Sequence, residues 1–303
     1  MSDAPDEVVR LAEERDRARQ AKDYAAADEL RARIRDAGFE ITDSPSGFEL
    51  SPIEAAPPKP PVRLSPSDVE SVLDQPAAFD ATVQWIAQGW PEDILRGIES
   101  FDRHAEGRSL QHVVVDALED VEAAWPDGAD VVRLNPSTGW AAARNAGLTR
   151  SLGRIVVVVD GSVEAQGDVI GPLAEALTDD QIGVTGPFGI ITEELHHFHE
   201  SSGPDVDAIE GYVMAVRRDL LKEGLRFDEK FKFYRTADIE LSFQVKSRGL
   251  RAVVTPVPVG RHEHRMWSNT PEDERERLSK RNFYRFLDRW RGRTDLTVAG
   301  SSE

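Results

Sequence analysis

The stretch EGYVMAVRRDLLKEGLRFDEKFKFYRTADIELSFQVKSRG, residues 210–249, is the most informative part of the chain. It opens with a small-residue turn at Gly211, continues into a short apolar strand through Met214, and then begins a basic helix. A Phe-Asp-Glu loop and an aromatic run follow, and the run ends on the acidic N-terminus of another helix. This order of elements predicts that one carboxylate, that of Asp238, lies at the mouth of a cleft floored by Gly211 to Met214.

The chain after residue 79 alternates short apolar runs with helical patterns. The run from Ile155 to Val159 has the length of a buried strand, and the segments between such runs carry apolar residues at helical spacing. This alternation predicts an α/β fold with a mostly parallel central sheet and helices on both faces. Asp116 and Asp160 each stand at the carboxyl end of an expected strand. Because ligands of open α/β sheets bind beyond these ends, we expect a nucleotide there.

Two groups of motifs resemble those of family 2 glycosyltransferases. One is Gly211-x-x-Met214-x-x-Arg-Arg, followed by Phe-Asp-Glu-x-Phe, an aromatic residue and a helix that closes on glycine. The other is Ala-Arg144-Asn145-Ala-Gly, in a helix before a strand that ends on an aspartate. The resemblance covers about residues 79–266. It implies a Rossmann-like GT-A fold and the transfer of a sugar from a nucleotide-diphosphate donor to a hydroxyl acceptor, with inversion at the sugar.

The resemblance also implies which residues contact the donor nucleotide. Asp116 matches the aspartate that contacts the base or ribose, although the Asp-x-Gly-Ser continuation of the family is missing. Arg144 would reach the nucleotide or its phosphates, because a guanidinium suits their charge and geometry, and Asn145 accompanies it. Gly211 and Met214 would form the floor of the site. The alternative for Arg144 is a solvated side chain on a helix that packs through small residues.

The metal-binding Asp-x-Asp of the family is altered here to Asp160-Gly-Ser162-Val-Glu164. Mg²⁺ or Mn²⁺ would need hard oxygen ligands at this place to neutralise the donor diphosphate. Ser162 could coordinate the ion, Glu164 could substitute for the lost carboxylate, or the site has lost its metal. His262 stands where many relatives supply a late metal or phosphate ligand. It forms a His-x-His pair with His264, whose rings would point to one face of an extended segment unless both are simply solvated.

Asp238 is the candidate general base. An inverting transfer needs a carboxylate that takes the proton of the acceptor hydroxyl as its oxygen attacks the sugar. The acidic pair of the family reads Ala237-Asp238 here, so its first member is lost. In a first helical turn Asp238 could instead only stabilise the helix, and the helix dipole is expected to lower its pKa. Phe231, Phe233 and Tyr234 would form a sugar platform or belong to the core.

The chain is expected to fall into an N-terminal module at residues 1–50, a proline-rich linker at 51–66 and a large domain at 67–303. The module shows two helices broken near Asp23 and a small β-hairpin after Gly38. It resembles the C-terminal appendage of cysteinyl-tRNA synthetases. The matching residues are Arg15, Ala18, Arg19, Lys22, Asp23, Ala27, Asp28, Leu30, Arg31, Gly38, Phe39, Asp43 and Gly47. The linker holds six prolines, which favour a semi-rigid polyproline conformation.

Composition narrows the classes of function. The 303 residues include no cysteine. The formal net charge of −18 argues against nucleic acid as a partner and against a broad surface for binding anionic membranes. No apolar run approaches the roughly 18 residues of a membrane span, and the N-terminus shows no signal region. We therefore expect a cytoplasmic protein whose contact with membranes is at most peripheral.

Two alternatives to catalysis stay open at this point. The altered metal motif and the missing acidic partner of Asp238 would suit a catalytically degenerate GT-A-fold scaffold. The synthetase-like module would suit an RNA-binding adaptor, although its thirteen acidic side chains outnumber its eight basic ones and weaken the electrostatic drive for RNA. A packing or dimerisation hairpin is the simpler interpretation of that module.

Overall fold

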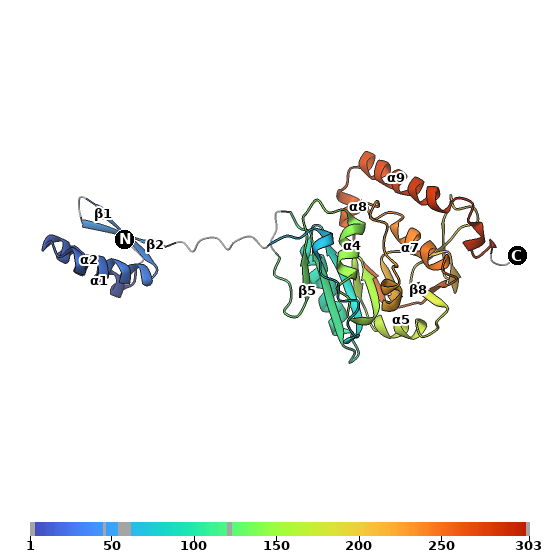
Figure 1. Ribbon diagram of the computed structural model, residues 1–303, viewed down its shortest axis with the longest axis horizontal. Helices are drawn as coiled ribbons and strands as arrows, with labels where there is room; N and C mark the ends of the chain where they lie inside the picture. Colours follow the sequence, from blue (N-terminus) through green and yellow to red (C-terminus); the bar gives the residue numbers. More distant parts are fainter. Residues whose placement is uncertain (1–3, 45–46, 54–61, 120–122, 301–303) are drawn as a thin grey trace. The chain divides into compact units, whose positions relative to one another are not determined.

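The structure is a computed structural model that describes residues 4–44, 47–53, 62–119 and 123–300 (Figure 1). It separates into two compact units, Met1–Pro60 and Pro61–Glu303. Of the expected linker at 51–66, residues 54–61 lie outside the described residues. At its described ends, Ser51 and Pro52 belong to a strand of the smaller unit, and Leu64 forms a parallel bridge with Leu134 in the larger unit.

The smaller unit is a helical hairpin followed by a β-hairpin. Its elements are α1 (Asp6–Gln20), α2 (Tyr24–Asp36), β1 (Phe39–Ser44) and β2 (Gly47–Pro52). Asp23 caps α2 by accepting a hydrogen bond from the N–H of Ala26 at 3.1 Å. Gly38, with φ of +84°, turns the chain from α2 into β1. The expected helix break and hairpin are thus confirmed, while Pro45 and Ser46 of the hairpin turn lie outside the described residues.

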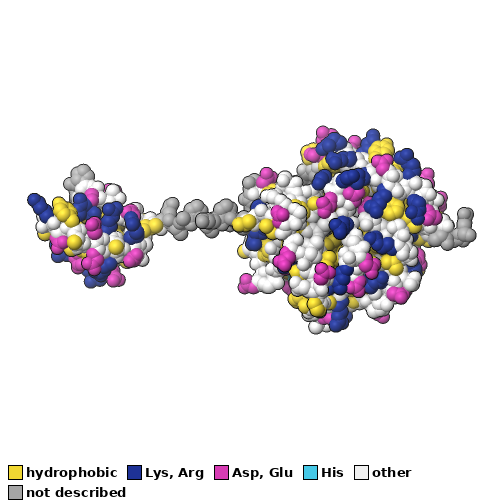
Figure 2. Space-filling model, in the orientation of Figure 1, with side chains coloured by type: hydrophobic (Ala, Val, Ile, Leu, Met, Phe, Trp, Pro, Cys, Tyr) yellow, Lys and Arg dark blue, Asp and Glu magenta, His cyan; other side chains and the backbone are white. Residues whose placement is uncertain are grey.

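Opposite charges pair with one another on the smaller unit. Asp43 accepts hydrogen bonds from Arg15 and Arg19, and Glu40 accepts from Arg31 and pairs with Arg35. On the face that Figure 2 shows, acidic and basic side chains are accordingly interspersed rather than segregated.

An eight-stranded mixed sheet forms the centre of the larger unit. Its strands, in spatial order, are β11 (Asp205–Val206), β14 (Arg251–Val254), β8 (Ile182–Gly186), β13 (Val213–Arg217), β6 (Gly153–Val159), β3 (Phe79–Ala87), β4 (Leu110–Asp116) and β5 (Asp130–Arg133). The block from β6 to β5 is parallel, as is the β8–β14 pair. β13 runs antiparallel to both of its neighbours, and β11 runs antiparallel to β14. The expectation of an α/β fold with a large, helix-covered sheet is confirmed.

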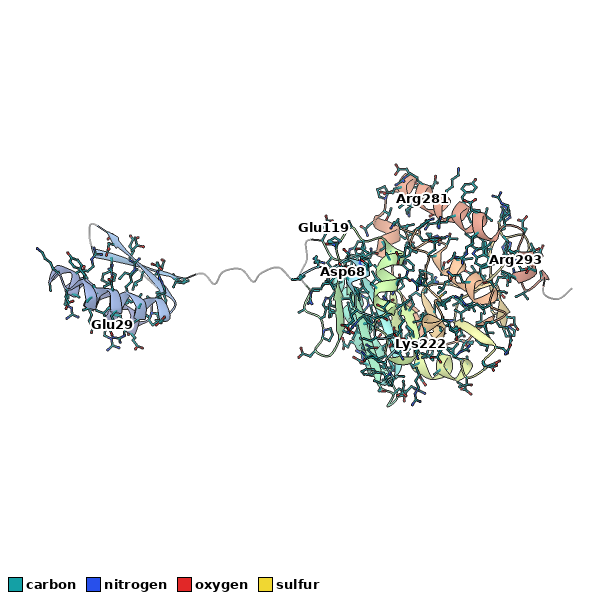
Figure 3. All side chains as sticks on the ribbon, in the orientation of Figure 1. Glu29, Asp68, Glu119, Lys222, Arg281 and Arg293 are labelled. Carbon is teal, nitrogen blue, oxygen red and sulfur yellow. The ribbon has the colours of Figure 1, made fainter. Side chains whose placement is uncertain are left out.

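Alternating side chains of the sheet build a core on each face. On β6, Val156 and Val158 pack with residues of α4 (Trp140–Leu148), α6 (Arg218–Lys222), α7 (Ala237–Lys246) and α9 (Glu272–Trp290). Ile155, Val157 and Val159 pack on the other face with α3 (Pro91–Arg103) and α5 (Ile170–Ala176). This explains the uninterrupted apolar run of β6, because a central strand is buried on both sides. Figure 3 shows side chains throughout the space between the sheet and its helices.

The helix α4 lies unusually close to the sheet. A Cβ built on Gly147 would come within 2.3 Å of Gln84 Nε2 and 2.6 Å of Val115 Cγ2. The small residues of the Ala-Arg-Asn-Ala-Gly motif therefore serve the close approach that the sequence predicts.

The remaining elements of the larger unit are short strands and helices outside the central sheet. They are β7 (Val163–Ala165), β15 (Val259–Arg261), β9 (Gly189–Ile191), β10 (His199–Ser201), β12 (Ala208–Ile209), α8 (Arg265–Asn269) and the short helices η1 (Pro66–Asp68) and η2 (Thr294–Leu296). β7 pairs with β15, and β9 pairs with β10 and β12. Among the described residues, no helix is both long and apolar enough to cross a bilayer.

Arg218 is a structural clamp at the start of α6. Its side chain is 3% exposed, and it donates hydrogen bonds to the carbonyls of Ser151, Gln75 and Val72 at 2.7, 2.8 and 2.7 Å. It thereby ties the segment that precedes β3 to the segment that precedes β6.

We predict that Arg218→Ala lowers the free energy of unfolding by about 3 kcal/mol, because three carbonyls lose a charged donor in a buried place. Arg217→Ala is the matched control, since Arg217 also donates to three carbonyls but in a more exposed position. We expect it to cost about 1 kcal/mol or less. Urea unfolding followed by circular dichroism measures both, and equal losses would contradict the assignment.

Candidate active site

Asp160 stands directly after β6, at the carboxyl end of the central strand. Its N–H donates to the carbonyl of Tyr212 at 3.0 Å. Oδ1 accepts hydrogen bonds from the N–H and the hydroxyl of Ser162. Oδ2 lies 3.2 Å from Nε2 of His264, so the carboxylate is held by a turn on one side and by an imidazole on the other.

The Asp160–His264 pair is an ion pair in a partly buried place. Burial opposes the charge of both groups, but their mutual hydrogen bond and attraction outweigh it. The pKa of Asp160 is therefore lowered and the pKa of His264 is raised. The two groups thus favour a carboxylate beside an imidazolium.

Arg144 lies beneath this site rather than in it. Its guanidinium is 2% exposed and donates to the carbonyl of Gln84 at 3.0 Å, to the side-chain oxygen of Gln84 at 2.6 Å and to the carbonyl of Val159 at 2.9 Å. Burial lowers its pKa to about 10, against the attraction of Asp160, so the side chain stays charged at neutral pH. Its terminal nitrogens are occupied by protein oxygens. The guanidinium thus holds β3 to the end of β6, and it also lines the smaller hollow beside Asp160. Its expected contact with the phosphates stays a prediction.

Asp238 lies in the first turn of α7, as the sequence predicts. Oδ2 accepts a hydrogen bond from the N–H of Gly211 at 2.8 Å, and Oδ1 accepts one from the N–H of Ile239 at 2.9 Å. Burial nevertheless raises the pKa of Asp238, and the backbone donors offset this only in part. The expected lowering by the helix dipole is thus wrong in direction, because desolvation of the carboxylate exceeds the effect of the N-terminal donors.

Asp160 and Asp238 open onto one cavity of about 340 Å³. Its lining comes from the ends of β6 and β12, the start of α7 and the chain before α8. The lining residues used below are Trp140, Asp160, Glu210, Gly211, Tyr212, Tyr234, Arg235, Asp238 and His264. A second, smaller hollow shares Trp140, Asp160, Tyr234 and His264 with it and extends towards Trp90, Asp93 and Arg265. The two carboxylates, far apart in the chain, therefore face the same space.

Aromatic rings form one wall of the cavity. Tyr234 stacks on His264 with ring centroids 4.6 Å apart, and Tyr212 meets the same imidazole edge-on at 6.1 Å. Phe231 and Phe233 are buried in the core instead. Only Tyr234 of the three aromatic residues expected around a sugar platform thus reaches the cavity.

Glu210 is a cavity residue that the sequence reasoning missed. Burial, and secondly the charge of Asp238, raise its pKa to about 7, with Arg261 and Arg235 opposing the shift. A carboxyl with such a pKa exchanges its proton near neutral pH. Its position directly before Gly211, in the most informative stretch of the chain, was the available signal.

Two of the expected nucleotide contacts, Asp116 and Met214, lie outside the cavity lining. Asp116 is buried and accepts hydrogen bonds from the N–H of Leu118 and the indole of Trp125, with Arg63 3.6 Å away. Met214 belongs to the core, although Gly211 does reach the cavity. Asp116 and Met214 are thus not among the residues that line the cavity, and their contact with the nucleotide stays a prediction.

Asn145 binds the Phe-Asp-Glu loop. Its amide nitrogen donates to the carbonyl of Phe227 at 2.9 Å and to Glu229, and its oxygen accepts from the N–H of Phe227 at 2.9 Å. The side chain thus anchors the loop that leads to α7, and it is not among the residues that line the cavity. Its expected contact with the nucleotide is corrected to this positioning role.

The four expected metal ligands divide into two pairs. Ser162 stays with Asp160, whereas Glu164 binds His262, with 2.8 Å between Oε2 and Nε2. The pairing of β7 with β15 sets this arrangement, because it places Gly260 opposite Glu164 and the N–H of His262 on the carbonyl of Ser162. The second histidine of the His-x-His pair is the one that reaches Asp160. In the described part of the chain, no three or more His, Cys, Asp or Glu side chains lie close enough together to hold a metal ion by themselves.

Comparison with known proteins identifies the domain that carries this cavity. Residues 112–241 match the family model described as glycosyl transferase family 2. This part of the chain is similar to family 2 glycosyltransferases. The matched segment begins within β4, includes β6, Asp160 and Asp238, and ends within α7.

Solved structures share the fold of the glycosyltransferase domain. The crystal structure of GalNAc-T7 with UDP, GalNAc and Mn²⁺ superposes with a TM-score of 0.56 at 14% sequence identity, over 70% of this chain and 49% of that chain. The chain thus spans about half the length of that protein. Lower TM-scores relate it to the mannosyltransferase PcManGT from Pyrobaculum calidifontis in complex with GDP-Man and Mn²⁺ (0.45, 20% identity, 62% of this chain and 57% of that one) and to S. aureus TarS 1-349 (0.46, 15% identity, 69% and 71%). The larger unit therefore has the fold of GT-A glycosyltransferases.

The N-terminal unit has a different relative. Over 51 residues, 17% of this chain, the sequence is 47% identical to the cysteine–tRNA ligase of Opitutus terrae, of which it covers 11%. The expected resemblance to that family is confirmed for this short segment alone.

We predict that Glu210→Gln stabilises the fold at pH 8. The pKa of Glu210 is raised from its ordinary value of 4.5 to about 7 in the folded state, so the wild-type protein loses stability as pH rises from about 4.5 to above 7. Removing the charge should raise the free energy of unfolding by on the order of 2 kcal/mol at pH 8 and by little at pH 5. Denaturant titrations at both pH values test this.

Glu200→Gln provides the control for that measurement, because Glu200 lines the same cavity but is exposed. We expect it to change stability little at either pH. A gain in Glu210→Gln that is the same at pH 5 and pH 8 would contradict the burial of the Glu210 charge.

Proposed function

We propose that the protein is a glycosyltransferase that moves a sugar from a nucleotide diphosphate to a hydroxyl acceptor, with inversion and with Asp238 as the general base. The observation that carries the proposal is the single cavity shared by Asp160 and Asp238, in a domain of the glycosyltransferase fold. The donor would lie on the Asp160 side and the acceptor on the Asp238 side.

The chemistry assigned to Asp238 is proton transfer. The acceptor oxygen forms a bond to the anomeric carbon as the bond to the diphosphate breaks, and the hydroxyl proton passes to the Asp238 carboxylate. The N–H groups of Gly211 and Ile239 hold that carboxylate in place. Its raised pKa makes it a stronger base than an exposed aspartate.

The residues around Asp160 fit a divalent cation. The carboxylate of Asp160 and, once His264 has given up its proton, an imidazole within 3.2 Å of it are oxygen and nitrogen donors of the kind that Mn²⁺ accepts, and the Ser162 hydroxyl adds an oxygen. Two or three protein ligands suffice where diphosphate oxygens complete the shell. Bound there, Mg²⁺ or Mn²⁺ would neutralise charge on the departing diphosphate. GalNAc-T7 was crystallised with UDP and Mn²⁺, which supports the choice of ion and of donor class.

A catalytically degenerate scaffold is the second candidate function. Ala237 replaces an acidic residue, and Ser162 replaces the second carboxylate of Asp-x-Asp. Such a scaffold would keep the cavity without turning over a nucleotide sugar. For the smaller unit, the pairing of Arg15, Arg19, Arg31 and Arg35 with Asp43 and Glu40 argues against an RNA-binding adaptor.

We predict that Asp238→Asn lowers kcat by about 100-fold or more, because the acceptor hydroxyl loses its base, while the affinity for UDP with Mn²⁺ is unchanged. Nucleotide release from UDP-, GDP- and TDP-sugars with Mn²⁺ measures turnover, and calorimetry measures UDP binding. Turnover equal to that of the wild type would remove Asp238 from the mechanism. An absence of both turnover and nucleotide binding in the wild-type protein would overturn the transferase proposal.

The two histidines of the His-x-His pair provide a matched comparison for the metal. We predict that His264→Gln weakens Mn²⁺-dependent UDP binding by about tenfold or more, because it removes a direct ligand, and that His262→Gln leaves it within about twofold of the wild type. The converse pattern would place the ion at Glu164 and His262, as the sequence first suggested.

A further inference from the structure

Two arginines flank the Asp238 side of the cavity and serve no visible structural purpose. Arg235 lines the cavity three residues before Asp238, and Arg261 ends β15. Both side chains are exposed. Within the described residues, neither guanidinium has a hydrogen-bond acceptor or a carboxylate partner, in contrast to the buried guanidiniums of Arg144 and Arg218.

Aromatic rings hold both guanidiniums in place. Cζ of Arg261 lies 4.4 Å from the centroid of Tyr212 and 5.0 Å from that of Phe188, and these two rings meet edge to face at 5.8 Å. Cζ of Arg235 lies 5.3 Å from the ring centroid of Trp267. Stacking on a ring orders a guanidinium while it leaves the N–H groups at its edge free to donate. The arginines are thus ordered donors without acceptors.

Both positive charges act on the same part of the cavity. Arg235 and Arg261 come from separate segments, yet each lies near enough to Glu210 to favour its ionised form. Arg235 also acts on Asp238. A ligand whose hydroxyl lies at Asp238 therefore has its neighbouring substituents within the field of two guanidiniums.

We propose that Arg235 and Arg261 form an oxyanion subsite, so that the acceptor carries a phosphate or a carboxylate close to the hydroxyl that receives the sugar. The inference rests on the proposed function for the place of the acceptor. Guanidiniums recognise both oxyanions through paired N–H donors, and a neutral sugar lacks a partner for them. In a chain of net charge −18, such a subsite selects an anionic acceptor that the average surface would repel.

The test compares glucose 6-phosphate, glucuronate and glucose as probes of the full-length protein, with UDP and Mn²⁺ present at saturation to occupy the donor side. Ligand-observed NMR gives the three dissociation constants. We expect at least one of the two anionic probes to bind about tenfold or more tightly than glucose. The anionic probe with the lower dissociation constant shows whether the subsite prefers a phosphate or a carboxylate. Equal affinities for all three probes would overturn the proposal.

Variants assign the effect to the two arginines. Arg235→Gln and Arg261→Gln should each abolish the preference for the anionic probe and leave UDP binding unchanged. Arg275→Gln is the matched control, because Arg275 stacks on the same Trp267 ring, 4.6 Å from its centroid, but it donates to the carbonyl of Trp267 and, unlike Arg235 and Arg261, is not among the charges that act on Glu210. It should retain the preference.

Two outcomes separate this inference from the proposed function. Loss of UDP affinity in Arg235→Gln or Arg261→Gln would place these arginines on the donor diphosphate and overturn the acceptor subsite. If the wild-type protein does not bind UDP, the transferase proposal fails, whereas the preference for anionic probes, measured without UDP, still reports on the two arginines.

Discussion

The buried guanidinium of Arg144 is the interaction on which the site depends. It bridges the last carbonyl of β6 and a carbonyl of β3 and lies 5.2 Å from the ring centroid of Trp140. A charge in such a place is stable only if its donors are matched by good acceptors, because desolvation is costly. The fold meets this requirement for the two terminal nitrogens with carbonyls of β3 and β6, and with the nearby negative charge of Asp160, while Nε has no partner within the described residues. The position of Asp160, one residue beyond Val159, follows from this arrangement.

Different environments then give the cavity carboxyl groups different properties. Asp160 has an imidazolium partner and is stabilised as an anion, whereas burial raises the pKa of Asp238 and of Glu210. Groups whose pKa values are separated by their surroundings are typical of sites that bind a cation at one end and transfer protons at the other. The stacked Tyr234 and His264 rings lie between these two ends. The electrostatic asymmetry of the cavity is therefore a product of the packing around it.

Much of the fold could be predicted from the sequence, because local patterns determine it. The apolar run of β6 and the small residues of α4 each imply their own packing, and Asp238 lies at the cavity as its motif implied. The site was less predictable where its details depend on contacts between distant segments. Local sequence does not predict that Arg63 and Trp125 surround Asp116. Nor does it predict that Asn145 anchors Phe227. The register of β7 with β15 decides that His264 rather than His262 pairs with Asp160. The pKa of Asp238 is raised by burial, which an argument from the helix terminus alone omits.

The account is tested most directly by a crystal structure of the protein with UDP and Mn²⁺. It predicts an ion coordinated by Asp160 and His264, with the diphosphate on that ion and with Asp238 facing the free part of the same cavity. An ion bound by Glu164 and His262, or UDP bound outside the cavity that Asp160 and Asp238 share, would contradict it.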